Sequence, residues 1–202
     1  AAVRKSLAEA ALVEVLERSP DEQEPPCPHA GRCGGCSWQS LAYGRQLAWK
    51  ERIVHDALER VGKMACPPML PILPSPSEWG YRNKMEFAFG VSGDGGKALG
   101  LRERGSRNIV EVTGCLLQTP LTMRVLEAVR MLSNGAFHDL DGRFLVVREP
   151  NAGGCFVELI VGAGGSLEAG ERFAAALRAE TPEVTGFALS ERLAPSDVAY
   201  GE

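Results

Sequence analysis

The 202-residue chain is 45% hydrophobic and carries a formal net charge of −4. A chain of this length can bury one or two ordinary cores without disulfide staples. The acidic balance argues against a generic nucleic-acid coat, because sequence-independent affinity for nucleic acid comes from Lys and Arg side chains that neutralise phosphates. The sequence shows no apolar run long enough to span a membrane, and Glu9 and Glu14 interrupt the N-terminal stretch that a signal peptide would need. We expect a cytoplasmic monomer.

The first apolar stretch fits two kinds of secondary structure. Across residues 7–16, Leu7, Ala11 and Val15 fit helical spacing, whereas Ala11, Val13 and Val15 also alternate as they would in a strand. Periodicity alone does not decide between the two. The acidic, proline-containing residues 19–26 then predict a linker.

A long helix is predicted over residues 40–61. Leu47, Val54, Leu58 and Val61 recur at helical spacing, and Gly62 follows them at the position expected of a left-handed cap residue. Residues 66–76 are rich in proline, which predicts an extended connector and a domain boundary.

Beyond residue 77, the order of strands and helices predicts an α+β fold, in which helices pack on a mixed or antiparallel sheet. Thr119 is expected to cap a helix that ends at Gly135, and Phe173 and Leu177 are expected to face the sheet from a second helix. Residues 162–165 lack the third glycine of a dinucleotide-binding loop, so we interpret them as an ordinary strand-to-helix turn. Strands are predicted at residues 85–89, 98–103, 109–112, 144–148, 156–161 and 184–190, and helices at 120–135 and 167–179.

Three of the six cysteines, Cys27, Cys33 and Cys36, lie within ten residues of one another. Such clustering indicates a metal site rather than a disulfide framework. Glycines in this segment allow sharp turns, so three thiols can face one point while backbone N–H groups approach their sulfurs. Cys115, which follows a predicted strand, is the best-placed fourth ligand. Cys155 begins a predicted strand and is expected to pack in the core.

Other interpretations of the cysteines stay open at this point. The pair Cys33-Gly-Gly-Cys36 alone also fits a redox dithiol or half of a zinc site. His29 could complete a zinc site with three cysteines, although a lone histidine is more often a bystander.

A locally basic segment lies between residues 80 and 110, which hold six basic and three acidic residues. An aromatic ring, an amide and several cations suit base stacking and phosphate contact in RNA. The alternative is that these charges are only solvated. The candidate RNA-binding residues are Tyr81, Arg82, Asn83, Lys84, Arg102, Arg104 and Arg107.

Three blocks of the sequence carry a resemblance to a known family: CPHAGRCGGCSWQSLAYGRQLAWK, WGYRNKMEFAFG and LGLRERGSRNIVEVTGCLLQ. They resemble the RNA uracil-5-methyltransferases that use S-adenosylmethionine, especially the branch that acts on 23S ribosomal RNA. The resemblance implies that Cys27, Cys33, Cys36 and Cys115 hold a 4Fe-4S cluster. It also implies that residues 1–20 are the remnant of an OB-like β-barrel, known as TRAM, so that residues 11–16 are expected to form a strand.

The same resemblance implies a domain plan and a function. Residues 21–76 would form the iron–sulfur loop, the long helix and a linker, and residues 77–202 an incomplete central RNA-binding domain. The family's catalytic domain, which binds S-adenosylmethionine and carries a nucleophilic cysteine, is not visible in this sequence, so we expect this chain not to be catalytic alone. RNA is the implied partner, with ribosomal RNA favoured over tRNA. The alternatives are a zinc-stabilised RNA-binding module without methyltransferase activity and an iron–sulfur electron carrier.

Overall fold

The computed structural model describes residues 2–4, 7–10, 12–162, 165–192 and 199, and the chain divides into two compact units. The helical unit comprises Ala1–Pro25 and Trp38–Leu73, and the sheet unit comprises Pro26–Ser37 and Pro74–Glu202. The cysteine-rich loop, residues 26–37, therefore groups with the sheet rather than with the helix that follows it in sequence. No helix in the described ranges is long and apolar enough to cross a membrane.

The N-terminal strand predicted at residues 11–16 is wrong over residues 12–16, which form no regular element. Leu12, Val13 and Leu16 are 81%, 96% and 90% exposed. A strand needs a neighbour to pair its backbone groups, and the structure describes none beside this segment. Residue 11 lies outside the described residues. The short hairpin of the unit instead joins β1 (Ala2–Arg4) to β2 (Leu7–Glu9).

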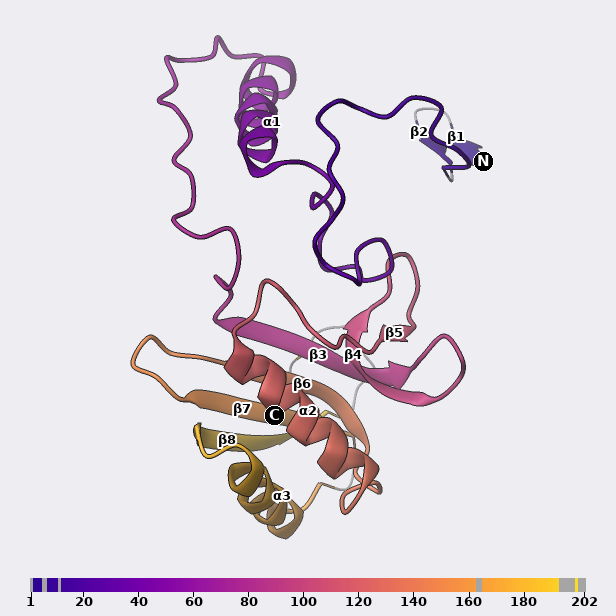
Figure 1. Ribbon diagram of the computed structural model, residues 1–202, viewed down its shortest axis with the longest axis vertical. Helices are drawn as coiled ribbons and strands as arrows, with labels where there is room; N and C mark the ends of the chain where they lie inside the picture. Colours follow the sequence, from indigo (N-terminus) through magenta and orange to yellow (C-terminus); the bar gives the residue numbers. More distant parts are fainter. Residues whose placement is uncertain (1, 5–6, 11, 163–164, 193–198, 200–202) are drawn as a thin grey trace. The chain divides into compact units, whose positions relative to one another are not determined.

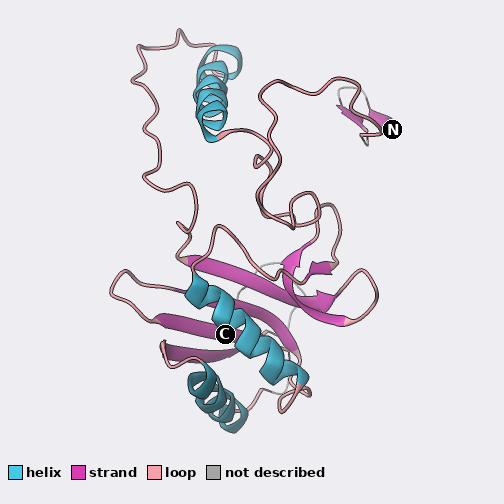
Figure 2. Cartoon of the chain, in the orientation of Figure 1, coloured by secondary structure: helices cyan, strands magenta, loops and turns pink. Residues whose placement is uncertain are grey.

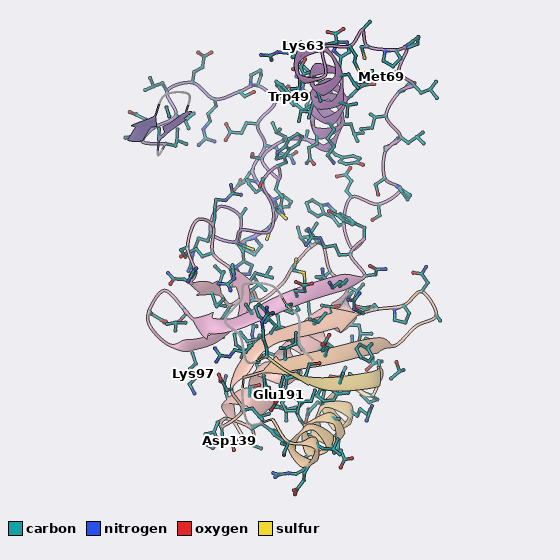
Figure 3. The ribbon with its side chains drawn as sticks, turned by 180° about the vertical axis from the view of Figure 1, so that it is seen from behind. Trp49, Lys63, Met69, Lys97, Asp139 and Glu191 are labelled. Atoms are coloured by element: carbon teal, nitrogen blue, oxygen red, sulfur yellow. The ribbon has the colours of Figure 1, made fainter. Side chains whose placement is uncertain are left out.

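The predicted long helix is confirmed as α1 (Tyr43–Asp56), which continues into the π-helical turn η1 (Ala57–Val61). It begins later than predicted because a turn precedes it, closed by Gln46 Nε2, which donates to the carbonyl oxygen of Leu41 at 2.9 Å. None of the described residues of α1 is buried within its unit, and Trp49 is 46% exposed (Figure 3). Helical periodicity predicted the element but not a partner for its apolar face.

The end of this helix differs from the prediction. Gly62 is right-handed, with φ −72°, and it is Lys63 that adopts the left-handed conformation, with φ 54°. A Cβ atom at Gly62 would lie 2.7 Å from the carbonyl oxygen of Leu58. Glycine is therefore required here by a close backbone approach rather than by its access to positive φ.

The sheet unit is built on a mixed six-stranded sheet in the order β5-β4-β3-β6-β7-β8 (Figures 1 and 2). All neighbours are antiparallel except β7 and β8, which are parallel and joined through a helix. The predicted α+β class and strand order along the chain are confirmed, although the third strand is shorter than predicted. The strands are β3 (Lys84–Val91), β4 (Lys97–Arg102), β5 (Ile109–Val110), β6 (Gly142–Arg148), β7 (Cys155–Val161) and β8 (Val184–Glu191).

Two helices, α2 (Pro120–Asn134) and α3 (Leu167–Glu180), cover one face of this sheet (Figure 1). The predicted cap is confirmed, since the Thr122 N–H donates to Thr119 Oγ1 at 3.2 Å. Phe173 and Leu177 are fully buried in the main core, as predicted. Burial of such a side chain contributes about 1.5–3 kcal/mol, so this face supplies most of the stability of the unit.

The other face of the sheet, called the open face below, points away from α2 and α3. It carries a smaller apolar cluster of Ala88, Ala98, Ile109, Phe144, Val146 and Ile160, against which Ala199 packs. Along each strand the side chains alternate between this face and the main core. The sheet therefore offers a second surface that the helices do not cover.

Candidate metal centre and nucleic-acid interface

The cysteine loop is hydrogen-bonded to the end of β4. The Gly34 N–H donates to the Arg102 carbonyl oxygen at 2.9 Å, and the Arg104 N–H donates to the Arg32 carbonyl oxygen at 2.8 Å. The Arg104 side chain adds a third contact, because its Nη2 donates to the Cys36 carbonyl oxygen at 2.7 Å. The loop is thus held by both backbone and side chain to the segment that carries the predicted basic residues.

His29 attaches the loop to a second segment, the one that leads to Cys115. The Thr113 N–H donates to His29 Nε2 at 3.1 Å, and Thr113 Oγ1 lies 3.2 Å from the same nitrogen. Because Nε2 accepts this hydrogen bond, it is not available to a metal in this arrangement. The contact gives His29 a role in positioning the loop.

Replacing His29 by alanine should therefore lower stability without changing metal content. Loss of one hydrogen bond to a backbone N–H lowers the free energy of unfolding by about 1 kcal/mol, equivalent to about 2–4 °C in Tm for a chain of this size. Metal analysis and thermal unfolding of the same preparations check this. Loss of metal from the variant would instead make His29 a ligand.

All four predicted cysteine ligands belong to the sheet unit. Cys33 and Cys115 are half-buried and pack against the main core. Burial raises the pKa of both thiols, and the charges of Cys36 and Cys27 raise the pKa of each further. These thiols belong to two segments, since Cys33 lies in the cysteine loop and Cys115 beyond β5, and both pack against the same core.

Backbone N–H groups point at two of these sulfurs. The Gly35 N–H donates to Cys33 Sγ at 3.4 Å. The backbone N–H groups of Leu117 and Gln118 hydrogen-bond to Cys115 and lower the pKa of its thiol. Bonds of this kind stabilise thiolates, which are the form of cysteine that binds metals. A set of four cysteines, two of which accept backbone hydrogen bonds, fits an iron–sulfur cluster and also a zinc ion.

Within the described ranges, no group of three or more His, Cys, Asp or Glu side chains is placed so that it could hold a metal ion. The set Cys27, Cys33, Cys36 and Cys115 therefore remains a prediction. Cys155 is assigned more firmly: it is fully buried at the start of β7, and burial, followed by the charges of Glu149 and Glu183, raises the pKa of its thiol to about 11. Its predicted place in the core is confirmed.

The first group of predicted RNA-binding residues leads into β3. Tyr81 is 57% exposed, and the Arg82 guanidinium is directed at Met85 Sδ, 3.9 Å away. The Asn83 carbonyl oxygen accepts a backbone hydrogen bond, and Lys84 Nζ pairs with Glu86 Oε1 at 2.5 Å. An exposed ring and an exposed cation are therefore available at this end of the strand.

The second group surrounds the end of β4. Arg102 is the last residue of this strand, and Arg104 and Arg107 follow in a turn. The turn is fixed by the Glu103 carboxylate, whose pKa is lowered by hydrogen bonds from the side chains of Ser106 and Asn108.

The register of the sheet brings the two groups to one edge. Ala88 of β3 pairs with Gly100 of β4 in antiparallel orientation, so the start of β3 and the end of β4 lie at the same end of the sheet. This is also the end to which the cysteine loop is bonded. The sequence predicted this proximity, because residues 85–89 and 98–103 were expected to form a hairpin. It gave no indication of the His29 and Arg104 contacts, because each joins segments far apart in the chain.

A cavity of about 460 Å³ lies between the cysteine loop and this end of the sheet. Two cations, Arg102 and Arg104, and two carboxylates, Glu86 and Glu103, line it, and Phe144 is among its uncharged lining residues. A second cavity of about 440 Å³ is lined by both cations and carboxylates, including Lys97 and Asp139 (Figure 3). The first cavity combines the predicted cations with the cysteine loop and is the stronger candidate for a nucleotide.

The chain is similar to proteins named uncharacterized RNA methyltransferases. It is 48% identical to one from Nitratidesulfovibrio vulgaris over 99% of its own length and 45% of that protein. It is 50% identical to one from Caldanaerobacter subterraneus, over 50% of this chain and 22% of that protein. It is 37% identical to one from Thermosynechococcus vestitus, over 63% of this chain and 28% of that protein. No family model matches the chain. The chain spans less than half the length of these relatives.

Proposed function

We propose that the chain is the iron–sulfur and RNA-recognition portion of an S-adenosylmethionine-dependent methyltransferase that acts on C5 of uracil in RNA, with 23S ribosomal RNA as the favoured substrate. Its catalytic domain would lie in sequence outside these 202 residues. One observation supports the proposal: the cysteine loop is hydrogen-bonded to the same sheet edge that carries Arg102 and Arg104.

We assign Cys27, Cys33, Cys36 and Cys115 as the ligands of a 4Fe-4S cluster. When bound, a cluster supplies a cross-link between chain segments and a redox-active centre. The chain's own contribution is to present the thiolates, with Gly35, Leu117 and Gln118 donating backbone hydrogen bonds to two of them.

The RNA would meet this edge of the sheet through its phosphates and bases. Arg102 and Arg104 line the cavity, and guanidinium groups bind phosphate oxygens in bidentate fashion. Tyr81 presents an exposed ring on which a base can stack. Arg104 also bonds the Cys36 carbonyl oxygen, so its replacement would disturb both the loop and the RNA surface.

A double substitution of Arg102 and Arg107 by glutamine therefore gives the cleaner test of RNA binding. Each phosphate contact with a single strand contributes about 0.7 to the slope of log affinity against log salt, so the slope should become shallower by about 1.4. The matched control replaces Arg52 and Arg60 of the helical unit, which pair with Asp56. An unchanged slope in the first variant, or an equal change in the control, would place the RNA surface elsewhere.

The proposed activity itself is tested with the longer natural protein. Incubated with 23S ribosomal RNA and S-adenosylmethionine, it should add one methyl group at C5 of a uracil, detected by mass spectrometry of the digested RNA. Methylation of tRNA alone would correct the substrate, and methylation of neither RNA would contradict the proposal.

A further inference from the structure

Phe156 of β7 is an aromatic ring on the open face of the sheet. Its neighbours Cys155 and Val157 are fully buried in the main core, so alternation along the strand directs Phe156 to the opposite side. It is 38% exposed and belongs to neither apolar cluster. The ring is therefore not part of the packing that holds the sheet to its helices.

Two cations lie in the same row across the sheet. Lys84 of β3 pairs with Arg148 of β6, and Arg148 pairs in turn with Phe156 of β7. Phe156 pairs with Gly186 of β8. A Cβ atom at Gly186 would lie 2.6 Å from Phe156 Cδ2, so the ring occupies the space above this glycine. The row thus presents an aromatic ring beside Arg148 and beside the ion pair of Lys84 with Glu86.

The arrangement of charges in this row is unfavourable for the sheet alone. Like charges directly opposite one another on neighbouring strands are destabilising, and Lys84 and Arg148 are such a pair. The ion pair between Lys84 and Glu86 offsets part of this repulsion. An anion bound over the row would neutralise the rest.

We infer that this row, Lys84, Arg148 and Phe156, is a binding platform for single-stranded RNA, in which a base stacks on Phe156 and flanking phosphates contact Arg148 and Lys84. Aromatic rings with adjacent cations are the recurrent means of holding unpaired nucleotides on a sheet. The inference rests on the proposed RNA partner and extends it to two residues, Arg148 and Phe156, beyond those predicted from the sequence.

The platform is continuous with the cavity beside the cysteine loop. Glu86, which lines that cavity, lies two residues beyond Lys84 on the same face and pairs with Val146, two residues before Arg148. The row and the cavity thus lie at neighbouring positions of β3 and β6. Bases can stack on Phe156 only when they are unpaired, because a duplex hides their faces.

The test measures binding of a fluorescein-labelled single-stranded RNA of mixed sequence, and of its duplex, to the full chain. Phe156→Ala should weaken binding of the single strand by about 5- to 100-fold, and Phe156→Trp should retain it, because stacking requires a π-face. Phe156→Leu, which keeps an apolar side chain without that face, should behave like alanine. Arg148→Gln should make the salt slope shallower by about 0.7. Met131→Ala, at a 50% exposed position of α2, is the matched control and should bind normally.

The outcomes separate this inference from the proposed function. If the double substitution of Arg102 and Arg107 weakens binding while the Phe156 and Arg148 variants bind normally, the platform is wrong and the proposed function stands. Full affinity of Phe156→Leu would show that RNA binding does not need an aromatic face and would overturn the platform. Equal binding of single strand and duplex would also overturn it. If the folded wild-type chain binds no RNA, both proposals fall.

Discussion

Replacing Cys115 by serine should remove as much iron from the anaerobically purified chain as replacing Cys33 does. Both thiols are half-buried against the main core, and both belong to the proposed ligand set. A cluster that loses one of four thiolate ligands has an open iron and is lost readily, so we expect less than about a tenth of the wild-type iron in either variant. Iron and sulfide analysis, with the visible absorbance of the cluster, measures the effect.

The matched control is Cys66→Ser. Cys66 is a cysteine of the proline-rich connector in the helical unit, outside the proposed ligand set. This variant should retain its iron. Full iron content in Cys115→Ser would remove Cys115 from the proposed site. Loss of iron in Cys66→Ser would make Cys66 a candidate ligand.

Replacing Gly100 by alanine should strongly destabilise the sheet unit, although it adds a single methyl group. A Cβ atom at Gly100 would lie 2.1 Å from the carbonyl oxygen of Val110, which belongs to the neighbouring strand. Backbone cannot yield as a flexible side chain does, so β4 and β5 would have to separate. We expect a loss of about 3 kcal/mol in the free energy of unfolding, or about 6–12 °C in Tm.

Gly93→Ala is the control for this substitution. It lies in the turn between β3 and β4, where an added Cβ meets nothing within 4 Å. Thermal unfolding should show little change for this variant. Equal stability of the Gly100 and Gly93 variants would contradict the close packing of β4 against β5.

The elements of the sheet unit were predictable because their signals are local. Thr119 followed by proline marks the start of α2, and alternation marks β3 and β7. Residues 12–16 were mispredicted because a strand exists only beside a partner, which lies elsewhere in the sequence. Gly62 was predicted to be the left-handed residue after the helix because a glycine follows the last apolar position. The sequence did not reveal that Lys63 takes that conformation instead.

Some features of the candidate site could be predicted from the sequence, and others depend on the fold. Three cysteines on one short loop are visible in the sequence, and so is the basic character of the segment that includes Arg102. The contacts of His29 with Thr113 and of Arg104 with Cys36 span distant segments and follow only from the fold. Phe156 was predicted as part of a strand, but its position beside Arg148 depends on the register between β6 and β7.

The most direct test of the central proposal is metal analysis combined with Mössbauer spectroscopy of the anaerobically purified wild-type chain. Four thiolates that converge on a cluster predict about four iron atoms and four sulfides per chain, with the spectrum of a 4Fe-4S centre. Stoichiometric zinc in a colourless protein without iron would contradict the account and favour a zinc-stabilised RNA-binding module.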